Sequence, residues 1–425
     1  MPSASSEVLI IGAGAAGLMS ARALTQAGRP VTLLEARTRC GGRVLPLPVP
    51  EFGYPAEAGA EYIHGAAPLT RALIEEAGLE FRPLTGKRWS LQEGRWVPRE
   101  NAAHQERFMA AMEQLTSDEP VGPFLERQFT GPEYEALRQL IVREVEGYNN
   151  AELGRFSAFA LREQWRDPDS ERQDRVMPGY GALIDFLLQS VLKAGATLHT
   201  GAEVVSLSVD GETITARCRD GRVFTGRQAI VTLPLPILNS LELPNALRGP
   251  VTTANAATGF GAVLKFHLRF RDRWWVKDRP DLADMGFVFH TNSAVPTWWT
   301  QVPAEHPVLT GWCSASRLVW VKGTSAAQRL DVALGSLAEI FGRPVPALKS
   351  DLVAWRANHW GEEEFSRGAY SYPTAETKAA LDALRAAAVG PILLAGEALY
   401  AEGETGTVEA ALASGRSAAE KIIAS

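Results

Sequence analysis

The sequence predicts an α/β protein in which a Rossmann-like dinucleotide-binding domain is intertwined with an α+β substrate domain. A strand, a glycine-rich turn, a helix and a second strand open the chain, and a strand–glycine–helix unit closes it. The length of 425 residues is too great for a single hydrophobic core. These observations together indicate two domains that share one cofactor.

Each glycine in the opening unit has a specific structural role. Residues 8–11, V-L-I-I, are typical of a buried parallel strand and lead into G-A-G-A-A-G. Gly12 makes the tight turn, Gly14 lets the backbone approach a pyrophosphate, and Gly17 lets the following helix pack on the strand. The phosphates are expected at the helix N-terminus, where free N–H groups and the helix dipole favour anions.

The second strand, Val31–Leu34, ends at Glu35, which follows Gly17 by 18 residues. An acidic side chain at about this distance accepts hydrogen bonds from the adenosine ribose in dinucleotide-binding proteins. A G-x-G-x-x-G sequence alone is weak evidence. Here strand, helix, second strand and acid follow in the right order, and this order predicts dinucleotide binding.

The residues after this strand carry a family resemblance. Residues 35–43, E-A-R-T-R-C-G-G-R, resemble the E-A-R-x-x-x-G-G-R signature of the flavin amine oxidase superfamily. That superfamily includes monoamine oxidases, polyamine oxidases, L-amino acid oxidases and histone lysine demethylases. The resemblance implies a GR2-type flavoprotein fold with FAD as cofactor. Gly41 and Gly42 permit a second close backbone approach, and Arg43 offers a charge-assisted fork to phosphate.

Composition excludes several other classes. With 46% hydrophobic and 22% charged residues the chain resembles ordinary globular proteins, and the net charge of −6 argues against nucleic acid as the main partner. No apolar run reaches the roughly 20 residues that span a membrane, and too few residues precede the first strand for a signal peptide. Three widely spaced cysteines suit reduced thiols, so a cytoplasmic location is expected. No metal-ligand spacing occurs, and a monomer and a homodimer both remain open.

A second resemblance covers residues 57–65, E-A-G-A-E-Y-I-H-G, which are similar to the L-G-A-x-W-I-H-G stretch of polyamine oxidases. In that family the segment passes beside the flavin. The resemblance implies that Gly59, Ala60 and Glu61 contact the cofactor and that His64 faces the substrate cavity. Without it, a lone histidine before a glycine would be a loop residue bonded to the backbone.

The pattern of elements assigns the rest of the chain. From about Trp89 to Arg172 the chain is expected to be helical and charged, as the helical part of the substrate domain. Residues 258–320 are expected to form the antiparallel sheet of that domain. The resulting FAD-binding domain comprises 1–85, 175–235 and 390–425, and the substrate-binding domain 86–174 and 236–389. Individual elements are predicted at Glu106–Leu115, Gly131–Gly147, 180–193, Thr197–His199, Glu203–Val209, Thr213–Cys218, Gln228–Leu233, Ala326–Phe341 and Thr405–Ile423.

Lys265 lies in the strand-like run A-V-L-K-F-H-L, whose pattern turns it inward with Val263 and His267. The family has a lysine in the matching place, before a strand that ends in aromatic residues, here Trp274–Trp275. In the family this lysine holds a water against flavin N5 and assists reoxidation by oxygen. Without the resemblance, an exposed lysine on a half-buried strand would be the interpretation.

A third resemblance covers Trp355–Tyr372, which is similar to the family's W-x(5–10)-G-x-Y stretch. It implies that Tyr370 is an aromatic wall beside the flavin and that Trp360 packs near the ring. Monoamine oxidases carry a flavin-bonded cysteine at the Ala369 position, so alanine implies non-covalent FAD. They also carry a second cage tyrosine where this chain has Thr407, so the aromatic cage is half built, as in polyamine oxidases and histone demethylases.

The C-terminal unit resembles the family's last FAD motif, with Gly396-Glu397 followed by G-T-V-E-A-A at residues 406–411. A helix that begins near Thr405 aims its N–H groups at the flavin carbonyl that gains negative charge on reduction. By resemblance Glu397 holds the ribityl chain, and Val204 lies in a strand whose backbone meets the adenine. The predicted cofactor-binding residues are Gly12, Gly14, Ala16, Gly17, Glu35, Ala36, Arg37, Gly41, Gly42, Arg43, Gly59, Ala60, Glu61, Val204, Gly396, Glu397, Thr407 and Val408.

The resemblance implies an FAD-dependent amine oxidase. A neutral amine loses hydride equivalents from its α-carbon to the flavin, water hydrolyses the imine, and oxygen is reduced to hydrogen peroxide. His64 and Thr407 favour secondary amines or polyamines as substrates. The predicted catalytic residues are Lys265, Tyr370, His64, Trp360 and Thr407.

Three alternatives remain open. An L-amino acid oxidase needs an arginine that clamps the carboxylate, and Arg71 and Arg162 are the candidates for it. A flavin dehydrogenase or desaturase of the same fold is the second alternative. A flavin-bearing interaction protein, such as a demethylase subunit, is the third; it needs a long helical insertion or an added recognition domain, and the sequence shows neither.

Overall fold

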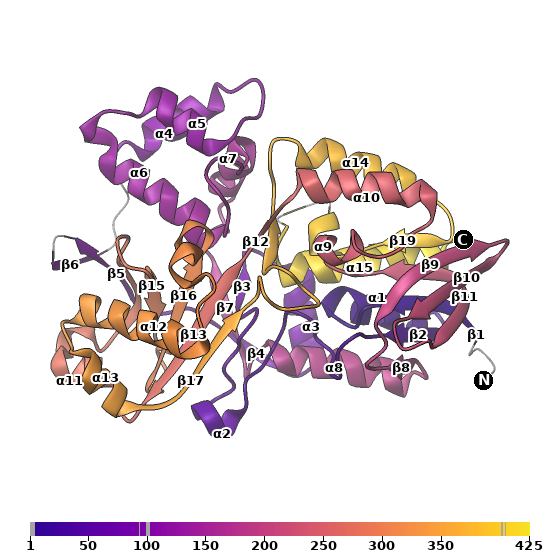
Figure 1. Ribbon diagram of the computed structural model, residues 1–425, viewed down its shortest axis with the longest axis horizontal. Coiled ribbons are helices and arrows are strands. Elements are labelled where there is room, and N and C mark those ends of the chain that lie inside the picture. Colours follow the sequence, from indigo (N-terminus) through magenta and orange to yellow (C-terminus); the bar gives the residue numbers. More distant parts are fainter. Residues whose placement is uncertain (1–4, 93, 99–102, 401–402, 404) are drawn as a thin grey trace.

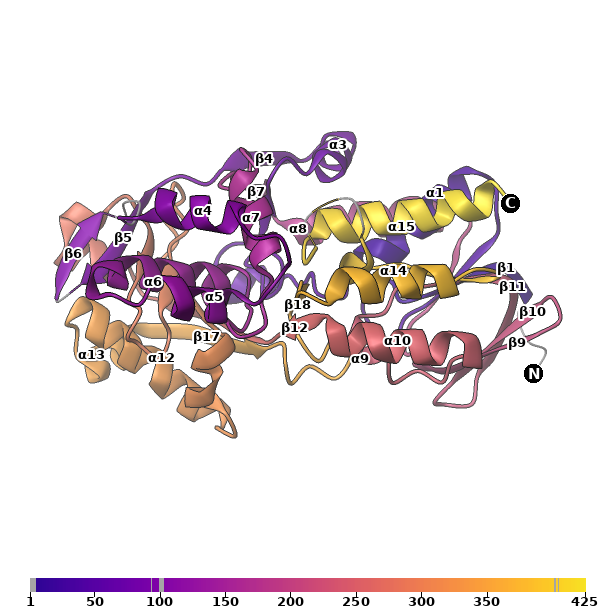
Figure 2. The same cartoon turned by 90° about the horizontal axis from the view of Figure 1, so that it is seen from above.

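A computed structural model of the protein describes residues 5–92, 94–98, 103–400, 403 and 405–425. The chain builds two lobes, each around a seven-stranded sheet, and the long axis of the molecule runs through both (Figures 1 and 2). Strand β1 and helix α15, near the two ends of the chain, lie in the same lobe. An α/β fold with two intertwined parts is therefore confirmed.

The first sheet has the strand order β8-β2-β1-β11-β10-β9, with β19 paired to β11. Strands β1, β2, β8, β11 and β19 run parallel, while β9 and β10 add an antiparallel edge. Predicted strands thus meet from three separate stretches of the chain. Their bounds are β1 (Ser5–Ile11), β2 (Val31–Leu34), β8 (Thr197–His199), β9 (Val204–Asp210), β10 (Thr213–Cys218), β11 (Val223–Val231) and β19 (Ile392–Leu394).

Helices cover both faces of this sheet, which explains why its central strands read as continuous apolar runs. Because side chains alternate along a strand, Val8 and Ile10 face one helical layer, and Leu9 and Ile11 face the other. The first layer is α1 (Ala15–Gln26), α8 (Tyr180–Lys193) and α15 (Val408–Ile423). The second is α9 (Leu235–Leu238), α10 (Asn245–Ala257) and α14 (Thr377–Ala387).

The packing of helices α10 and α14 does not follow the predicted domain boundaries. Both lie within 236–389, the range predicted for the substrate domain, yet they pack on the first sheet (Figure 2). Leu247 of α10 and Leu381 of α14 belong to the same hydrophobic cluster as Leu9. The apolar faces of both helices are therefore buried against the first sheet. The sequence of an amphipathic helix shows which of its faces is apolar, but it does not show against which sheet that face packs.

The second sheet has the order β17-β13-β16-β15-β14-β5-β6 and is mostly antiparallel. Helices α11, α12 and α13 pack on it through a cluster rich in tryptophan and leucine. The element bounds are β5 (Lys87–Gln92), β6 (Arg95–Pro98), β13 (Val263–Phe270), β14 (Met285–Phe289), β15 (Thr297–Trp299), β16 (Val308–Ser314), β17 (Leu352–His359), α11 (Trp274–Asp278), α12 (Ala326–Phe341) and α13 (Val345–Asp351).

Two predictions about this lobe are wrong. The region from Trp89 does not begin as helix, because β5 and β6 form a hairpin whose Trp89 and Trp96 pack against the second sheet's core. Trp274 and Trp275 do not end the strand of Lys265. They begin α11, where their rings fill the same core.

The helical part has its own core, with Phe108, Phe124 and Phe129 at its centre. The helices predicted at Glu106–Leu115 and Gly131–Gly147 both exist. The second is divided into a short 3₁₀-helix, an α-helix and the π-helix Arg143–Tyr148. A π-helix adds one residue to a turn and is not visible in a 3.6-residue pattern. The bounds are α4 (Gln105–Glu113), α5 (Val121–Gln128), α6 (Glu135–Val142) and α7 (Ala158–Arg166).

Two small sheets connect the lobes. One has the order β3-β7-β4, and the other pairs β12 with β18. Within the described residues, no helix combines the length and the apolar character needed to cross a bilayer. The bounds of these strands and of the two remaining helices are β3 (Tyr62–His64), β4 (Glu80–Pro83), β7 (Gln173–Met177), β12 (Gly259–Gly261), β18 (Tyr370–Tyr372), α2 (Val49–Phe52) and α3 (Pro68–Glu76).

Candidate active site

One large cavity is lined by elements of both lobes. Its volume is about 1300 Å³, above the roughly 300–1000 Å³ that is usual for a small-molecule pocket. All of the residues predicted to bind the cofactor or to take part in catalysis line it, except Gly17. The cavity therefore brings together segments from the beginning, the middle and the end of the chain.

The glycine turn between β1 and α1 forms one end of this cavity. Gly12 has a φ of +102°, and a Cβ on Gly17 would lie 1.9 Å from the carbonyl oxygen of Gly12. Gly17 thus lets helix pack on strand, away from the cavity surface. Gly14 forms a β-bridge with Gly41, so the two glycine segments that were predicted to approach a pyrophosphate lie side by side.

Glu35 is buried where β2 ends. Its carboxylate accepts hydrogen bonds from the backbone N–H of Ala13 (2.8 Å) and of Arg37 (2.9 Å). The segment that leads into Val204 lies against it, because the N–H of Ala202 donates to the Glu35 carbonyl (2.8 Å). Glu35 is therefore fixed beside the glycine turn, and Val204 belongs to the same end of the cavity.

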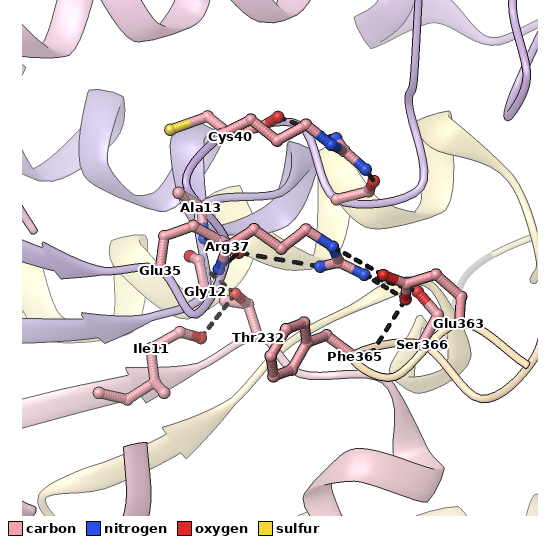
Figure 3. Close-up of polar contacts among 12 residues, drawn as sticks. Ile11, Gly12, Ala13, Glu35, Arg37, Cys40, Thr232, Glu363, Phe365 and Ser366 are labelled. Carbon is pink, nitrogen blue, oxygen red and sulfur yellow. Dashed lines mark hydrogen bonds and ion pairs between the residues drawn. The ribbon is translucent and has the colours of Figure 1, made fainter. Parts of the chain in front are cut away.

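Arg37 bridges the cavity's edge to a distant loop, residues 361–368, which we call the strap. Its Nε and Nη2 donate to the Glu363 carboxylate (3.1 and 2.5 Å), and Nη2 also donates to Ser366 Oγ (3.1 Å). The guanidinium lies over the Phe365 ring at 5.3 Å. Figure 3 shows Arg37 reaching from the Glu35 side to these strap residues. A contact 326 residues distant in sequence could not be read from the motif.

Arg43 and Glu397 form an ion pair of 2.7 Å between the two predicted FAD motifs. Arg43 also donates to the Ala369 carbonyl (2.9 Å), and Glu397 accepts from Ser371 Oγ (2.5 Å) and from the Gly406 N–H (2.9 Å). The two residues were predicted to touch phosphate and ribityl separately. The structure makes them partners that join the N-terminal and C-terminal motifs.

Helix α15 begins at Val408, three residues later than predicted, with Thr407 as its N-cap. The Thr407 hydroxyl accepts a hydrogen bond from the Ala410 N–H (3.0 Å). Both Thr407 and Val408 line the cavity, so the positive end of the helix dipole points at it.

Lys265 is buried in the middle of β13. Its ammonium donates to the carbonyls of Glu57 (2.7 Å) and Gly59 (3.1 Å) and to the carboxylate of Glu61 (2.7 Å). An ammonium group has three N–H donors, so the protein uses all of them. Lys265 therefore fixes the segment 57–61 along the cavity wall.

Glu61 is the charged partner in this arrangement. Besides Lys265, it accepts from Arg175 Nη2 (3.0 Å) and Trp299 Nε1 (3.2 Å). Burial alone would raise the pKa of Glu61, but the charges of Lys265 and Arg175 outweigh burial and lower it to about 2. The carboxylate is therefore ionised at neutral pH and leaves one net positive charge among the three groups.

Three aromatic side chains, Trp299, Trp312 and Tyr370, form a row along the cavity wall that begins beside Lys265. Trp299 lies 6.2 Å from Trp312, and Trp312 stacks on Tyr370 at 6.4 Å, measured between ring centroids. The Tyr370 hydroxyl donates to the carbonyl of Tyr148 in the π-helix (2.7 Å). Trp360 also lines the cavity, and its buried indole donates to the Ala58 carbonyl (2.9 Å).

His64 lies at the end of β3 with its ring against Tyr148. Its Nδ1 is 3.0 Å from the Tyr148 hydroxyl and 3.4 Å from the Gln173 side-chain nitrogen. Burial lowers the pKa of His64 to about 4, so the imidazole is neutral at physiological pH.

No sequence pattern indicated much of the substrate arm, the part of the cavity beyond His64 and Tyr370. Arg71 and Arg162, the weighed carboxylate clamps, do not belong to its lining. Arg71 instead pairs with Asp174 (2.6 Å). The hairpin β5 and the π-helix supply residues that only the fold brings here. The lining of the arm includes Tyr62, Arg88, Arg143, Glu144, Tyr148, Glu163, Asp167, Glu171, Gln173, Phe287 and Phe289.

The nucleotide end of the cavity fits FAD. A pair of glycine segments leaves room for a pyrophosphate, the N-termini of α1 and α15 supply dipoles that favour negative charge, and Glu35 lies where a ribose would be bound. Ala369 offers no nucleophile for a covalent bond to the flavin. These features were predicted separately, and the cavity unites them.

Comparisons with known proteins agree with this geometry. The sequence model of the flavin containing amine oxidoreductases matches residues 15–423. Polyamine oxidase 4 of Oryza sativa subsp. japonica is 25% identical, with 97% of this chain and 88% of that protein aligned. Putrescine oxidase of Kocuria rosea is also 25% identical, over 98% of this chain and 95% of that one. A solved structure of putrescine oxidase bound to putrescine superposes with a TM-score of 0.82, 22% identity and full coverage of both chains.

Proposed function

Because the chain belongs to the flavin containing amine oxidoreductases, we propose that it oxidises a secondary amine or a polyamine with O₂ as electron acceptor. FAD is its cofactor, held without a covalent bond. The single observation that carries the proposal is that one cavity joins the glycine turn to an arm walled by Trp299, Trp312 and Tyr370. The Oryza polyamine oxidases and the Kocuria putrescine oxidase support this substrate class.

The charge of the substrate arm supports a cationic substrate. Four acidic residues, Glu144, Glu163, Asp167 and Glu171, line it, against two arginines, and even with Glu163 paired to Arg162 and Arg166 the acids remain in excess. An excess of negative charge in a cleft attracts cations and raises their local concentration. A polyamine keeps charged nitrogens beyond its reacting one, and these would meet the acidic side chains.

The aromatic row supports an amine near Tyr370. An aromatic face attracts a nitrogen by the ring quadrupole, and Tyr370 is held in place by its bond to the Tyr148 carbonyl. Thr407 stands where a second cage tyrosine would narrow the space. A half-built cage leaves room for a substituent on the nitrogen, which a secondary amine carries.

The reaction removes two electrons and two protons from the C–N bond of the amine and gives an imine. FAD supplies the two-electron acceptor, and O₂ takes up the two electrons and two protons to form hydrogen peroxide. Water then cleaves the imine to a carbonyl compound and an amine. The chain's residues orient the amine between the aromatic row and His64, and positioning of this kind contributes much of the acceleration in such reactions.

An L-amino acid oxidase is the second candidate, and one observation favours it. Arg88 and Arg143 both line the substrate arm. A guanidinium is the side chain best suited to bind a carboxylate. The two candidates differ in whether the substrate carries a carboxylate next to its amine.

The test is hydrogen peroxide release by the purified holoenzyme across a panel of amines. The panel contains spermidine, N-acetylated polyamines, putrescine, phenylethylamine, N-methyl amines and L-amino acids. Turnover of polyamines or secondary amines supports the proposal. Turnover confined to L-amino acids replaces it with the second candidate, and amine-dependent FAD reduction without peroxide would replace O₂ by another electron acceptor.

A further inference from the structure

A chain of three side chains leads into the substrate arm from three elements. Arg88 on β5 donates from Nη2 to the Gln173 side-chain oxygen (3.2 Å), and Gln173 on β7 meets His64 on β3 through its side-chain nitrogen (3.4 Å). His64 and Gln173 are opposite each other in the β3–β7 ladder. The chain is therefore built into the sheet that connects the two lobes.

The direction of each bond follows from the chemistry of the groups. A guanidinium has donors only, so the Gln173 oxygen must face Arg88. The amide nitrogen of Gln173 then faces His64, and an amide nitrogen also has donors only. Nδ1 of His64 must therefore be the acceptor, and it cannot carry a proton.

The Tyr148 hydroxyl fits the same assignment. It lies 3.0 Å from His64 Nδ1 and can donate to it. In a neutral imidazole one nitrogen carries the proton and the other accepts. With Nδ1 accepting from both Gln173 and Tyr148, the proton of His64 is on Nε2.

The surroundings leave Nε2 open to the cavity. His64 lines the cavity, and none of the residues that the structure describes forms a hydrogen bond with Nε2. Tyr62 on its own strand and Tyr148 on the π-helix are the titratable groups whose rings face the imidazole, and Arg88 lies behind Gln173. Among the described residues no carboxylate forms an ion pair with His64, and burial disfavours an imidazolium.

We propose that Gln173 is a positioning residue that fixes His64 as an N–H donor toward the reacting nitrogen of the amine. The inference rests on the proposed oxidation of amines. A neutral amine presents one lone pair, which can accept from Nε2–H, whereas an ammonium has only donors and would be repelled by it.

The first test is direct. The holoenzyme, labelled with ¹⁵N-histidine, is examined by NMR at pH 7, where the two neutral tautomers give different ring-nitrogen shifts, with His64→Gln used to assign the signal. Wild-type His64 is expected as the neutral Nε2–H tautomer. A proton on Nδ1, or an imidazolium, would overturn the inference.

Gln173→Glu is the informative variant, because a carboxylate accepts where the amide donates. It should move the proton of His64 to Nδ1 or hold the ring as an imidazolium, and raise its pKa by roughly one to two units. kcat/KM for the best amine should fall about tenfold, as expected for one lost hydrogen bond. An unchanged His64 tautomer would contradict the proposal.

Two further variants keep the test interpretable. Gln164→Glu adds the same charge to the cavity wall without touching His64 and should leave the His64 signal unchanged. Gln173→Leu removes the donor without adding a charge and should weaken amine turnover with no upward shift of the pKa. The FAD content of each variant shows that the cavity is intact. A wild type that oxidises no amine would defeat the proposed function, whereas a wrong tautomer in an active enzyme would defeat only this inference.

Discussion

At the scale of single residues, the cavity wall depends on three charges, two cations that both lie within hydrogen-bond distance of the Glu61 carboxylate. Lys265 and Glu61 were predicted for different tasks, catalysis and cofactor binding, and the structure makes them an ion pair. Arg175, which the sequence did not indicate, is the third member. A buried charge that loses its partner is costly, so each residue constrains the other two.

The first prediction concerns this pair. Lys265→Met should lower the free energy of unfolding by about 1–3 kcal/mol, since it leaves two backbone carbonyls without their donor while Arg175 still balances the charge of Glu61. The double variant Lys265→Met with Glu61→Gln should be less stable still, because Arg175 then loses its carboxylate partner, and chemical denaturation of both single variants and the double variant gives the coupling. A loss in the double variant that equals the sum of the two single losses would mean that the pair is not coupled. Slower reoxidation by O₂ in Lys265→Met stays a prediction, checked by stopped-flow on the same protein.

The second prediction concerns Glu57, whose burial raises its pKa from 4.5 to about 7. Its Oε1 accepts from the Gly181 N–H (2.9 Å), and its Oε2 is buried with no partner among the described residues. A raised pKa means that this group favours the folded state below pH 4.5 and that its contribution is lost as pH rises through 7.

The Glu57→Gln side chain has the shape of a protonated glutamate and stays uncharged at every pH. The variant should therefore lose less stability than wild type between pH 5 and 7, by on the order of 1 kcal/mol per pH unit. Thermal denaturation across that range measures it. Parallel curves for the two proteins would show that Glu57 does not titrate there.

At the scale of elements, the strap 361–368 closes the nucleotide end of the cavity through Arg37. Glu363, Ser366 and Phe365 all contact this one guanidinium. The strap connects β17 to β18, so it belongs to the polypeptide that also carries Trp360 and Tyr370. One continuous segment thus supplies both the residues that hold Arg37 at the nucleotide end and part of the aromatic wall.

The third prediction follows from this strap. Glu363→Gln removes the charge that holds Arg37 and should speed FAD release from the holoenzyme roughly tenfold, as one charge-assisted bond is lost. Glu362→Gln is the matched control, because the neighbouring glutamate pairs with Arg329 on α12 instead. Release is followed by the fluorescence of free FAD after dilution. Equal rates in the two variants would remove the strap's role.

Helix α15 and the π-helix show what can be read from sequence at this scale. The apolar pattern and the glycine before it located α15, with an error of three residues at its start. The π-helix was not located, although it supplies the Tyr148 carbonyl and hydroxyl to Tyr370 and His64. Its extra residue per turn is stabilised by these distant contacts.

At the scale of the whole molecule, the cavity is made by the meeting of two lobes. Its lining comes from both large sheets, from the helical part and from the small connecting sheets. Residues of the first and the last helix of the chain line it, and they would hold a cofactor bound there. The lobes should therefore be coupled through the cofactor.

The fourth prediction is that removal of FAD lowers the thermal stability of the entire protein. A ligand that binds only the folded state, at about 100 times its dissociation constant, stabilises it by about 2.7 kcal/mol. Added FAD should restore the transition temperature of the apoprotein in a concentration-dependent manner. Riboflavin, which lacks the pyrophosphate, is the control and should restore little. A transition independent of FAD would show that the lobes fold without the cofactor's help.

Location and oligomeric state belong to this scale as well. The expected cytoplasmic location stays a prediction, as does the choice between monomer and homodimer. The described cysteines, Cys40, Cys218 and Cys313, are all free, as the sequence predicted.

The sequence by itself determined the nucleotide-binding half of the site. Gly12, Gly17 and Glu35 are local features, since a turn, a helix packing and a strand end depend on neighbours within some twenty residues. The paired blocks at residues 35–43 and 396–411 identified the cofactor before any fold was known. Local sterics and hydrogen-bond geometry are strong enough to fix such motifs without the rest of the chain.

Only the tertiary structure decided the substrate half. The partners of Arg37, Arg43 and Lys265 lie more than 200 residues away, and the Gln173–His64 contact depends on the register of β3 against β7. The same is true of α10 and α14, whose apolar faces suited either sheet. Long-range packing chooses among such equal local options, because the free energy that decides between them comes from burial against distant elements.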